Sequence, residues 1–354
     1  MRLCGGLLTV LFMHYSISRF SFTPVSMVIR HSRKPRVSGI RTSPPKKYSL
    51  SAMQHPPLTI TIGIPAYNEE ENIAPLIEAL KTQKTTHGQI AEIIVISDGS
   101  ADRTAERVRS LFNEHIQLIV WERREGLNRA QNKILAEANG DILVILNADV
   151  LPANDMFIQE IIDPIINDAR VGLVSADMIA AKPLGAFEKI IANSYAFKNR
   201  TYKALRDQDN IYLCHGQARA FSRAFYMQMK WPDEFPEDAY SYIMCLRKGF
   251  AFRFVHSAQV LFRCPQNLSD HLRQSCRFID GKERLTQSFN SSLIRAYYHI
   301  PLWLFLRELG KSLAKHPLLT TAYLFIMVFV RMSGWRPSHA SKYEISKSSK
   351  KVLV

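Results

Sequence analysis

An alternation of strand and helix patterns between residues 58 and 175 constrains the fold more than any other feature of this chain. Short apolar runs rich in β-branched residues predict buried strands, and apolar positions at helical spacing predict the helices between them. We expect strands at residues 59–64, 92–96, 117–121, 142–146 and 171–175. We expect helices at residues 69–82, 102–113, 127–138 and 155–167. This pattern predicts an α/β fold with a mainly parallel, doubly wound sheet covered on both faces.

The first two strands end in polar residues. The first strand should stop at Pro65, which has no N–H for a sheet ladder, and Asn68 is a candidate N-cap for the helix that follows. The second strand ends at Asp98, and because the polar residues after it should cap the next helix, Asp98 is expected to point freely into the crevice. In an open α/β sheet this edge, at the carboxyl ends of the strands, is where ligands bind.

Motifs and cysteines disfavour several classes of protein. Neither Gly-x-Gly-x-x-Gly nor the Gly-Lys-Ser/Thr of a phosphate loop follows the first strand, which argues against dinucleotide oxidoreductases and P-loop kinases. The five cysteines are odd in number, and no pair has zinc-ligand spacing. We therefore expect a reducing compartment and no disulfide framework.

The net charge of +15 is concentrated at the two ends of the chain. Residues 1–68 contain nine Lys or Arg and no acidic residue, and residues 295–354 contain ten Lys or Arg and two Glu. Residues 69–294 carry 27 basic and 29 acidic residues. A nucleic-acid enzyme would carry its basic surface on the folded core, so nucleic acid is not an expected partner. Basic ends fit an anionic membrane surface, with solvated basic tails as the alternative.

The ends also define the expected domain organisation. Residues 1–57 predict a basic, disordered extension, and one hypothesis is that translation begins at Met53. Peptides from residues 1–50 in a mass spectrum of the native protein would contradict that hypothesis. Residues 58–290 should form the main domain, divided near residue 175 into a nucleotide-binding half and an acceptor half (residues 176–290). Membrane-associated helices at residues 291–335 and a basic tail at 336–354 should follow.

The apolar segment Pro317–Val330 has fourteen residues without charge, which is fewer than a membrane-spanning helix needs. It predicts amphipathic helices in the membrane interface, or one short C-terminal span, on the cytoplasmic face of a membrane. Burial of this segment against the main domain is the alternative.

Five motifs, spread over residues 58–280 in the expected order, resemble those of the family-2 inverting glycosyltransferases, which have the GT-A fold. They are Pro65-Ala66-Tyr67-Asn68-Glu69-Glu70, Ser97-Asp98-Gly99-Ser100, Asn147-Ala148-Asp149, Glu237-Asp238 and Gln274-Ser275-Cys276-Arg277-Phe278. The last is similar to the Gln-x-x-Arg-Trp motif of membrane-associated members such as cellulose, chitin and hyaluronan synthases, with Phe278 in place of Trp. This chain has no set of full-length apolar spans, so a polymer-secreting channel is not expected.

On the donor side the resemblance implies a nucleotide site beside a metal site. The residues implied to hold the nucleotide are Pro65, Ala66, Tyr67, Glu69, Asp98 and Asn132. Asp149 and Asn147 would hold Mg²⁺ or Mn²⁺, because a divalent cation offsets the charge that develops on a nucleoside diphosphate as it leaves. Asn147 stands where the family has Asp, and an amide oxygen is a weaker ligand than a carboxylate.

On the acceptor side the resemblance implies that Asp238 is the base that deprotonates the acceptor hydroxyl. Glu237 would accept a hydrogen bond from the acceptor or from neighbouring backbone. Gln274, Arg277 and Phe278 would contact the acceptor and the diphosphate, since an arginine pairs with phosphate and an aromatic ring stacks on a sugar.

The sequence therefore predicts an inverting glycosyltransferase that uses a nucleotide-diphospho-sugar, expected to be UDP-linked, and a hydroxyl acceptor on a carbohydrate or lipid. Three alternatives stay open. A polyprenyl-phosphate sugar synthase shares the fold, and a nucleotidyltransferase would release pyrophosphate instead of a nucleoside diphosphate. Because Asn147 weakens the metal site, a non-catalytic pseudo-glycosyltransferase that binds carbohydrate or membrane is the third.

Overall fold

A single mixed sheet organises the chain in the computed structural model, which describes residues 57–111, 113–332 and 352. Within these residues the strands pair in the order β3-β2-β1-β4-β7-β6-β8-β5. The strands are β1 (Leu58–Ala66), β2 (Gly88–Asp98), β3 (Ile116–Trp121), β4 (Ile142–Leu146), β5 (Val150–Pro152), β6 (Val171–Ala180), β7 (Ala218–Ser222) and β8 (Ala251–Phe262). The strands β3-β2-β1-β4 are mutually parallel, and antiparallel β7 joins them to the parallel pair β6 and β8. The predicted α/β fold with a mainly parallel sheet is confirmed.

Helices cover both faces of this sheet. They are α2 (Ile73–Lys81), α3 (Thr104–Ser110), α4 (Leu127–Glu137), α5 (Phe157–Asn167), α6 (Ala186–Lys203), α7 (Arg223–Tyr226), α8 (Glu237–Arg247), α9 (Leu268–Ser288), α10 (Ser291–Tyr297), α11 (Leu302–Lys315) and α12 (Pro317–Met332). Side chains of β4 alternate between the two cores, as a strand requires. Val144 packs in the core beneath α2, α3 and α5, whereas Leu143 and Ile145 pack in the core beneath α4, α7 and α8.

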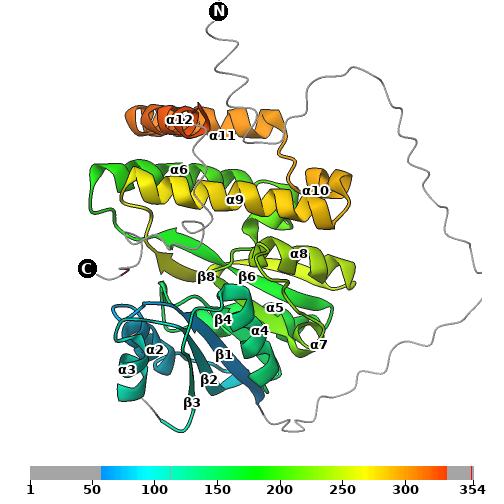
Figure 1. Cartoon of the computed structure of the whole chain (residues 1–354). Coiled ribbons are helices and arrows are strands. Elements are labelled where there is room, and N and C mark those ends of the chain that lie inside the picture. The colour runs from blue at the N-terminus through cyan, green and yellow to red at the C-terminus, as the bar shows by residue number, and fades with distance from the viewer. Residues whose placement is uncertain (1–56, 112, 333–351, 353–354) are drawn as a thin grey trace, which may run out of the picture.

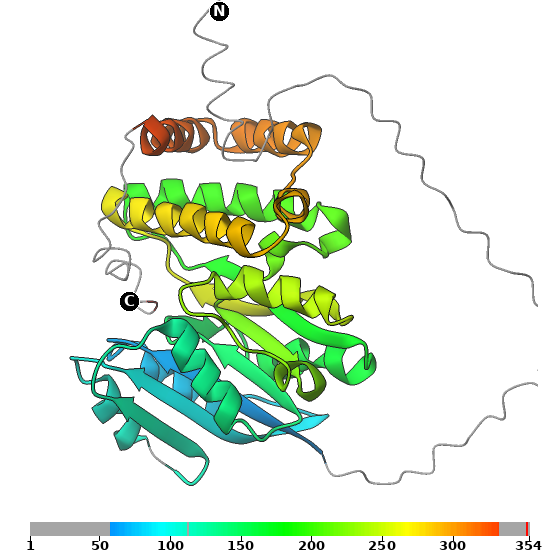
Figure 2. The same ribbon diagram turned by 45° about the vertical axis from the view of Figure 1, so that its right-hand side comes forward.

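The remaining helices form two further layers beyond the sheet. In Figures 1 and 2, α6 and α9 lie side by side over the second half of the sheet, and α11 and α12 lie beyond them. Helix α6 packs against both α11 and α12. Small apolar clusters, distinct from the two sheet cores, hold these layers together, including the edge-to-face pair of Phe197 and Phe305 with ring centroids 5.5 Å apart. The layers place the motif helix α9 between the sheet and the C-terminal helices.

Helix ends show where local sequence signals were right and where they were wrong. Gly249 closes α8 with a φ of +82°, as its position after Lys248 predicts. The predicted capping role of Asn68 is wrong, because α2 begins later, at Ile73. Asn68 instead takes a left-handed φ of +53°, and its side-chain oxygen accepts a hydrogen bond from the Ala101 N–H at 2.8 Å. Asn68 therefore fastens the loop after β1 to the loop after β2.

The C-terminal segment forms two helices rather than one long one. Helix α11 ends at Lys315, and Pro317 starts α12 at once. Among the described residues, no helix combines the length and the apolar character that crossing a bilayer requires. The predicted N-terminal extension and basic tail lie, apart from residues 57 and 352, outside the described residues.

Candidate active site

The loop after β1 forms the first wall of the site. Pro65 and Ala66 end the strand in buried positions, and Tyr67 is half-buried beyond them. The Glu69 N–H donates to the Thr104 hydroxyl at 2.7 Å, and one Glu69 carboxylate oxygen accepts from the Asn72 amide at 2.8 Å. The implied nucleotide residues of this loop are therefore held in place by contacts within the protein.

Asp98 has a structural role that the sequence did not indicate. It was expected to point freely into the crevice, but its two carboxylate oxygens accept the backbone N–H groups of Glu125, at 2.6 Å, and Gly126, at 3.0 Å. The side chain is buried, with 4% of its surface exposed. Asp98 thus anchors the turn that starts α4, and a contact with the nucleotide base stays a prediction.

A second contact links the loop after β3 to the first wall. The Arg124 guanidinium lies over the Tyr67 ring, 4.1 Å from its centroid. Such a stacked cation leaves its N–H groups at the rim of the ring, where they can donate to phosphate oxygens. Arg124 was not among the residues predicted to bind the nucleotide. Its position just before the turn glycine Gly126 was the one feature of the sequence that could have indicated it.

Asn132 lies on α4 but is occupied by the protein itself. Its amide nitrogen donates to the Trp231 carbonyl at 2.8 Å, and its side-chain oxygen accepts from the Trp231 N–H at 2.9 Å. Through these two hydrogen bonds, Asn132 holds α4 against the segment before α8. The implied contact between Asn132 and the nucleotide stays a prediction.

The candidate metal residues lie between β4 and β5. The Asn147 N–H donates to the Gln217 carbonyl at 2.9 Å, while the side-chain oxygen of Asn147 is buried and has no hydrogen-bond partner among the described residues. A buried oxygen of this kind is costly unless a donor or a cation meets it. Asp149 follows two residues later and is half-buried.

These two residues fit a metal that shares its ligands with a substrate. No group of three or more metal-ligating carboxylate, imidazole or thiol side chains occurs in the described part of the chain. A Mg²⁺-type site commonly uses one or two carboxylates, substrate phosphates and water. Asp149 and the Asn147 oxygen supply the protein part of such a set.

The candidate base lies in the first turn of α8. The Asp238 carboxylate is half-buried and accepts the Ala239 N–H at 2.6 Å. Burial and the adjacent Glu237 charge raise the pKa of Asp238 to about 7. Glu237 lies directly against Gly216, where even a methyl group would meet its carboxylate. A carboxylate with a pKa near neutrality is suited to accepting a proton at physiological pH.

Arg277 brings the donor and acceptor motifs together. Its side chain reaches solvent, but the protein around it lowers its pKa, while the charges of Glu237 and Asp149 act in the opposite direction. Arg124 lies close enough to lower the same pKa. Arg277 therefore lies within electrostatic reach of the candidate metal residue, the candidate base pair and the arginine that stacks on Tyr67.

The other two residues of that motif face elsewhere. Gln274 and Phe278 line a cavity between helices whose lining does not include Arg277. Of the three motif residues, Arg277 is the one on which the charges of Glu237 and Asp149 act.

A buried arginine that the sequence did not reveal supports α8. The Arg219 side chain is fully buried and donates to the Glu237 carbonyl at 3.0 Å and to the Ser241 hydroxyl at 2.8 Å. These bonds fix the first turn of α8, and with it the two carboxylates, on the antiparallel strand β7. Arg219 lies on β7, outside the strands expected from the sequence, and no local signal marked it.

Comparisons with known proteins bear on the family and the fold. Residues 61–229 match the family described as "Glycosyl transferase family 2". A curated relative, a dolichol-phosphate mannosyltransferase from Pyrococcus furiosus, is 29% identical over 119 residues, which are 33% of this chain and 33% of that protein. The chain thus matches about a third of that relative's length.

Two solved structures are similar to this chain. A mannosyltransferase from Pyrobaculum calidifontis, in complex with GDP-Man and Mn²⁺, has a TM-score of 0.53 at 19% identity and covers 81% of this chain and 83% of its own. Glucosyl-3-phosphoglycerate synthase from Mycobacterium tuberculosis, in complex with Mn²⁺, UDP and phosphoglyceric acid, has a TM-score of 0.44 at 21% identity, covering 63% of this chain and 78% of its own. The fold is the GT-A fold of the glycosyltransferases, and residues 61–229 form a glycosyltransferase domain.

Proposed function

We propose that this chain, which carries a glycosyl transferase family 2 domain over residues 61–229, transfers a sugar from a nucleotide-diphospho-sugar to a hydroxyl acceptor with inversion at the anomeric carbon. The observation that carries the proposal is the position of Arg277, within electrostatic reach of both Asp149 and Glu237. A cation on which both a metal-type carboxylate and a base-type carboxylate act is suited to a diphosphate leaving group that departs next to the attacking hydroxyl.

Each part of the site has a separate task in this proposal. Tyr67 and Arg124 would hold the nucleotide, and Asp149 with Asn147 would hold Mg²⁺ or Mn²⁺. Such a cation, when bound, offsets the charge that develops on the diphosphate. Asp238 accepts the proton of the acceptor hydroxyl as the oxygen attacks. Because attack and departure occur on opposite faces of the sugar in one step, the configuration at the anomeric carbon is inverted.

The nucleobase of the donor can be identified by ligand stabilisation. We predict that one nucleoside diphosphate raises the melting temperature of the protein in the presence of Mn²⁺, because a ligand bound only by the native state stabilises it. UDP is the expected nucleotide, and GDP is the main competitor because the Pyrobaculum calidifontis structure contains GDP-Man. The measurement is differential scanning fluorimetry with UDP, GDP, ADP, CDP and TDP, each with and without Mn²⁺.

The result of that panel also decides the pseudo-glycosyltransferase alternative. Asn147 in place of a carboxylate is the observation that favours it. Suppose that a nucleotide raises the melting temperature, but that no nucleoside diphosphate is released from the matching nucleotide-sugar with any acceptor tested. That result would favour binding without turnover. No shift with any nucleotide would contradict the proposed donor site.

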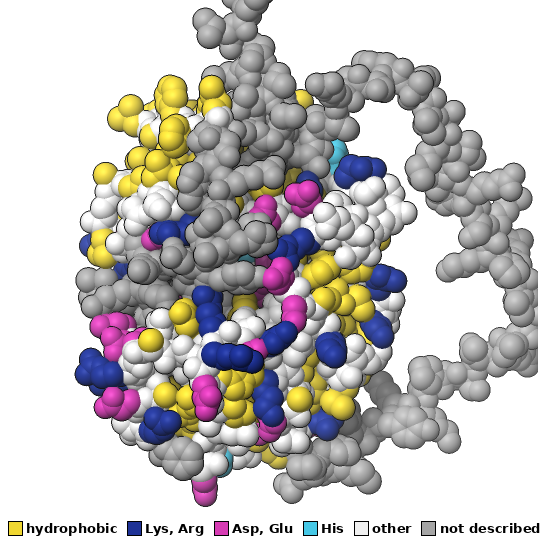
Figure 3. Space-filling view, viewed as in Figure 1, with side chains coloured by type: hydrophobic (Ala, Val, Ile, Leu, Met, Phe, Trp, Pro, Cys, Tyr) yellow, Lys and Arg dark blue, Asp and Glu magenta, His cyan; other side chains and the backbone are white. Residues whose placement is uncertain are grey.

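We also propose that the enzyme works at the cytoplasmic face of a membrane, docked through α11 and α12. Large apolar side chains are exposed on these two helices, and Figure 3 shows hydrophobic side chains gathered over this end of the molecule. They are Leu302, Trp303, Leu306, Leu318, Phe325, Phe329 and Met332. On α12 the spacing of seven, four and three residues places them along one helix face.

Charge on the same helices favours an anionic bilayer as the partner. Arg307, Lys311 and Lys315 are exposed on α11, and the Arg307 guanidinium lies 5.2 Å from the centroid of the exposed Trp303 ring. Arg307 and Lys311 also pair with the buried Glu308. An apolar face that also carries cations is typical of helices that lie in the membrane interface, where each basic residue contributes about 1 kcal/mol near anionic lipid. The apolar face and these cations together are called the membrane-docking face below.

We predict that Phe325→Ser with Phe329→Ser weakens binding to vesicles of phosphatidylcholine and phosphatidylserine by at least about tenfold. Burying one large apolar side chain is worth about 1.5–3 kcal/mol, and both rings are more than half exposed, at 69% and 52%. The measurement is co-sedimentation of the full chain with vesicles. Met227→Ser is the matched control, because Met227 is 64% exposed but lies at the end of α7, outside α11 and α12.

Salt and lipid composition complete this test. Binding of the wild type should fall as ionic strength rises and should be weaker to vesicles without phosphatidylserine. Equal sedimentation of the double variant and the wild type would contradict the membrane-docking face, as would a wild type that does not sediment with anionic vesicles.

A further inference from the structure

A cavity of about 210 Å³ lies between two helices of the acceptor half and the C-terminal helix α12. Helix α6 contributes Lys198 and Tyr202, α12 contributes Tyr323 and Met327, and the turn η2 (Ile211–Leu213) contributes Tyr212. Helix α9 contributes the residues His271, Gln274, Ser275 and Phe278. The cavity is smaller than the ~300–1,000 Å³ of sites for drug-sized ligands, so a compact group fits it better than an oligosaccharide does.

The sequence positions show that the cavity is built from ordered helix faces. On α9 the lining residues follow one another at intervals of three, one and three, which is one face of a helix. The lining residues of α6 and those of α12 are each four apart. Each helix therefore turns one continuous face toward the cavity.

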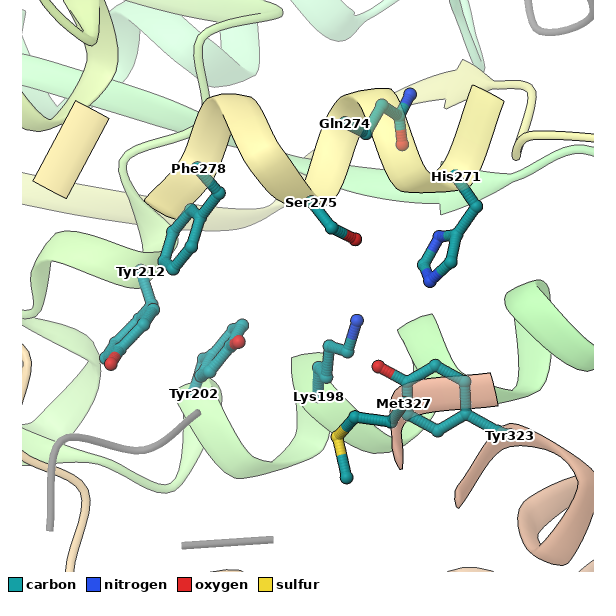
Figure 4. Close-up of a pocket in the computed structure, with 9 residues that line it drawn as sticks. All are labelled: Lys198, Tyr202, Tyr212, His271, Gln274, Ser275, Phe278, Tyr323 and Met327. Atoms are coloured by element: carbon teal, nitrogen blue, oxygen red, sulfur yellow. The ribbon is translucent and has the colours of Figure 1, made fainter. Parts of the chain in front are cut away.

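One end of the cavity is polar and positively charged. Figure 4 shows the Lys198 ammonium, the Ser275 hydroxyl and the His271 imidazole pointing into the same space. The Lys198 nitrogen lies 5.0 Å from the centroid of the Tyr323 ring, and no carboxylate of the described residues forms an ion pair with it. A half-buried cation surrounded by hydroxyl groups is arranged to bind an anion.

The protonation states support that arrangement. Burial acts to lower the pKa of Lys198, but the neighbouring Tyr323 and Tyr202 side chains outweigh it and the pKa is raised. Burial raises the pKa of Tyr202 to about 12. At neutral pH the cavity therefore presents an ammonium group and a protonated hydroxyl, both of which donate hydrogen bonds.

The other end of the cavity is aromatic. Tyr202 and Tyr212 are stacked with centroids 4.4 Å apart and an interplanar angle of 7°, and Phe278 lies at the same end in Figure 4. Met327 adds a flexible apolar side chain. A ligand with a charged head and an apolar neighbouring portion matches both ends.

The aromatic residue Tyr298 contacts two of the residues that line this cavity. The Tyr212 hydroxyl donates to the Tyr298 carbonyl at 2.8 Å, and the Phe278 ring meets the Tyr298 ring edge-on at 6.0 Å. Burial raises the pKa of Tyr298, and the charge of Asp238 acts in the same direction. Tyr298 therefore connects the lining of the cavity with the neighbourhood of the candidate base.

We propose that this cavity binds the phosphate group of an amphiphilic acceptor and thereby positions a separate hydroxyl of that acceptor at Asp238. Lys198 is the cation that holds the phosphate, and the aromatic end holds the first part of the apolar chain. The inference rests on the proposed function, because it assigns the acceptor of that reaction. It also agrees with the membrane-docking face, since Phe325 and Tyr323 belong to the same helix, exposed on one side and lining the cavity on the other.

The test is isothermal titration of the full chain with decyl phosphate below its micelle concentration, beside decanol and inorganic phosphate. We expect Lys198→Met to weaken decyl phosphate binding about 10- to 100-fold, because it removes a charge-assisted hydrogen bond from a partly buried site. Lys198→Arg keeps the charge and should stay within a few-fold of wild type. Lys189→Met is the matched control, because Lys189 is an exposed lysine on the same helix that does not line the cavity.

Each outcome decides the inference. The inference would be overturned if decyl phosphate bound the wild type and Lys198→Met equally well. It would also be overturned if decyl phosphate did not bind the wild type. Equal affinity for inorganic phosphate and decyl phosphate would indicate a site for free phosphate, and would also overturn the acceptor assignment. Stabilisation by Mn²⁺ and the donor nucleotide should be the same in Lys198→Met and wild type. A wild type that Mn²⁺ and the donor nucleotide do not stabilise would count against the proposed function, independently of the cavity.

Discussion

Asp238→Asn is expected to lower kcat by about 10²–10⁴-fold while the affinity for the donor nucleotide stays within a few-fold of wild type. An amide of the same shape cannot accept the proton of the acceptor hydroxyl, but it preserves the first turn of α8 and the contact with the Ala239 N–H. The measurement is steady-state release of nucleoside diphosphate with saturating donor. Asp168→Asn is the control, because Asp168 is a carboxylate in the turn before β6 that pairs with Arg170 at 2.9 Å.

The pH profile gives an independent check on this role. Only ionised Asp238 can accept a proton, and its pKa is about 7, so kcat/KM of the wild type should rise as the pH increases through about 7. The Glu237 charge raises the pKa of Asp238, so Glu237→Gln should shift the midpoint to lower pH. A wild-type profile that is flat between pH 5 and pH 9, or an Asp238→Asn variant with full activity, would contradict the assignment.

Stability should change in the opposite direction to activity. Folding raises the pKa of Asp238 from its ordinary value of 3.8 to about 7, so the native state binds a proton more tightly than the unfolded state does. The free energy of unfolding should therefore fall as the pH rises from about 4 to about 7 through this group. Asp238→Asn should be more stable than wild type at pH 8, and this advantage should disappear near pH 4.

Asp149→Ala is expected to abolish the Mn²⁺-dependent part of nucleotide binding, with a loss of about 10²-fold or more in affinity for the nucleoside diphosphate. Asp149 is the carboxylate that the described residues offer beside the Asn147 oxygen, and coordination through substrate phosphates needs at least one protein carboxylate. The measurement is calorimetric titration of the nucleotide with and without Mn²⁺. Asp155→Ala is the control, since Asp155 is a more exposed carboxylate paired with Lys84 at 2.5 Å.

A second variant tests the same site by a gain of function. Asn147→Asp places a carboxylate where the unpartnered amide oxygen lies, so it should tighten Mn²⁺-dependent nucleotide binding. Binding in Asp149→Ala that is unchanged and still requires Mn²⁺ would contradict the metal assignment. If nucleotide binding by Asn147→Asp depended less on Mn²⁺ than binding by the wild type, the Asn147 amide would contact the nucleotide and not the metal.

The parallel half of the fold was predictable because its signals are local. The parallel strands between residues 58 and 175 are compact apolar runs and each helix shows its own periodicity, so β4 at Ile142–Leu146 was predicted at its observed bounds. The short strand β5 (Val150–Pro152) was not predicted. Right-handed crossovers then place the carboxyl ends of the strands at one edge. The antiparallel strand β7 was not predictable in the same way, because its place between β4 and β6 depends on pairing over long sequence separations.

The position of a site residue was predictable where its motif ends a strand or begins a helix. Its partners were not predictable where they come from distant parts of the chain. Asp98 was placed at the correct strand end, but its partners belong to the turn at residues 125–126. Asn132 was placed on the correct helix, but its amide clamps Trp231. The cavity around Lys198 joins residues up to 129 positions apart and has no motif of its own. Contacts of this kind arise only when the helices pack.

The measurement that tests the account most directly is ³¹P and ¹H NMR of the reaction products. The reaction contains the full chain, Mn²⁺ and the nucleotide-sugar that the stabilisation panel selects. The acceptor is a membrane extract or an alkyl phosphate that also carries a free hydroxyl group. We predict release of a nucleoside diphosphate and a new glycoside whose anomeric configuration is the inverse of that of the donor, both absent with Asp238→Asn. Release of pyrophosphate, or a product that retains the configuration of the donor, would contradict the proposed function.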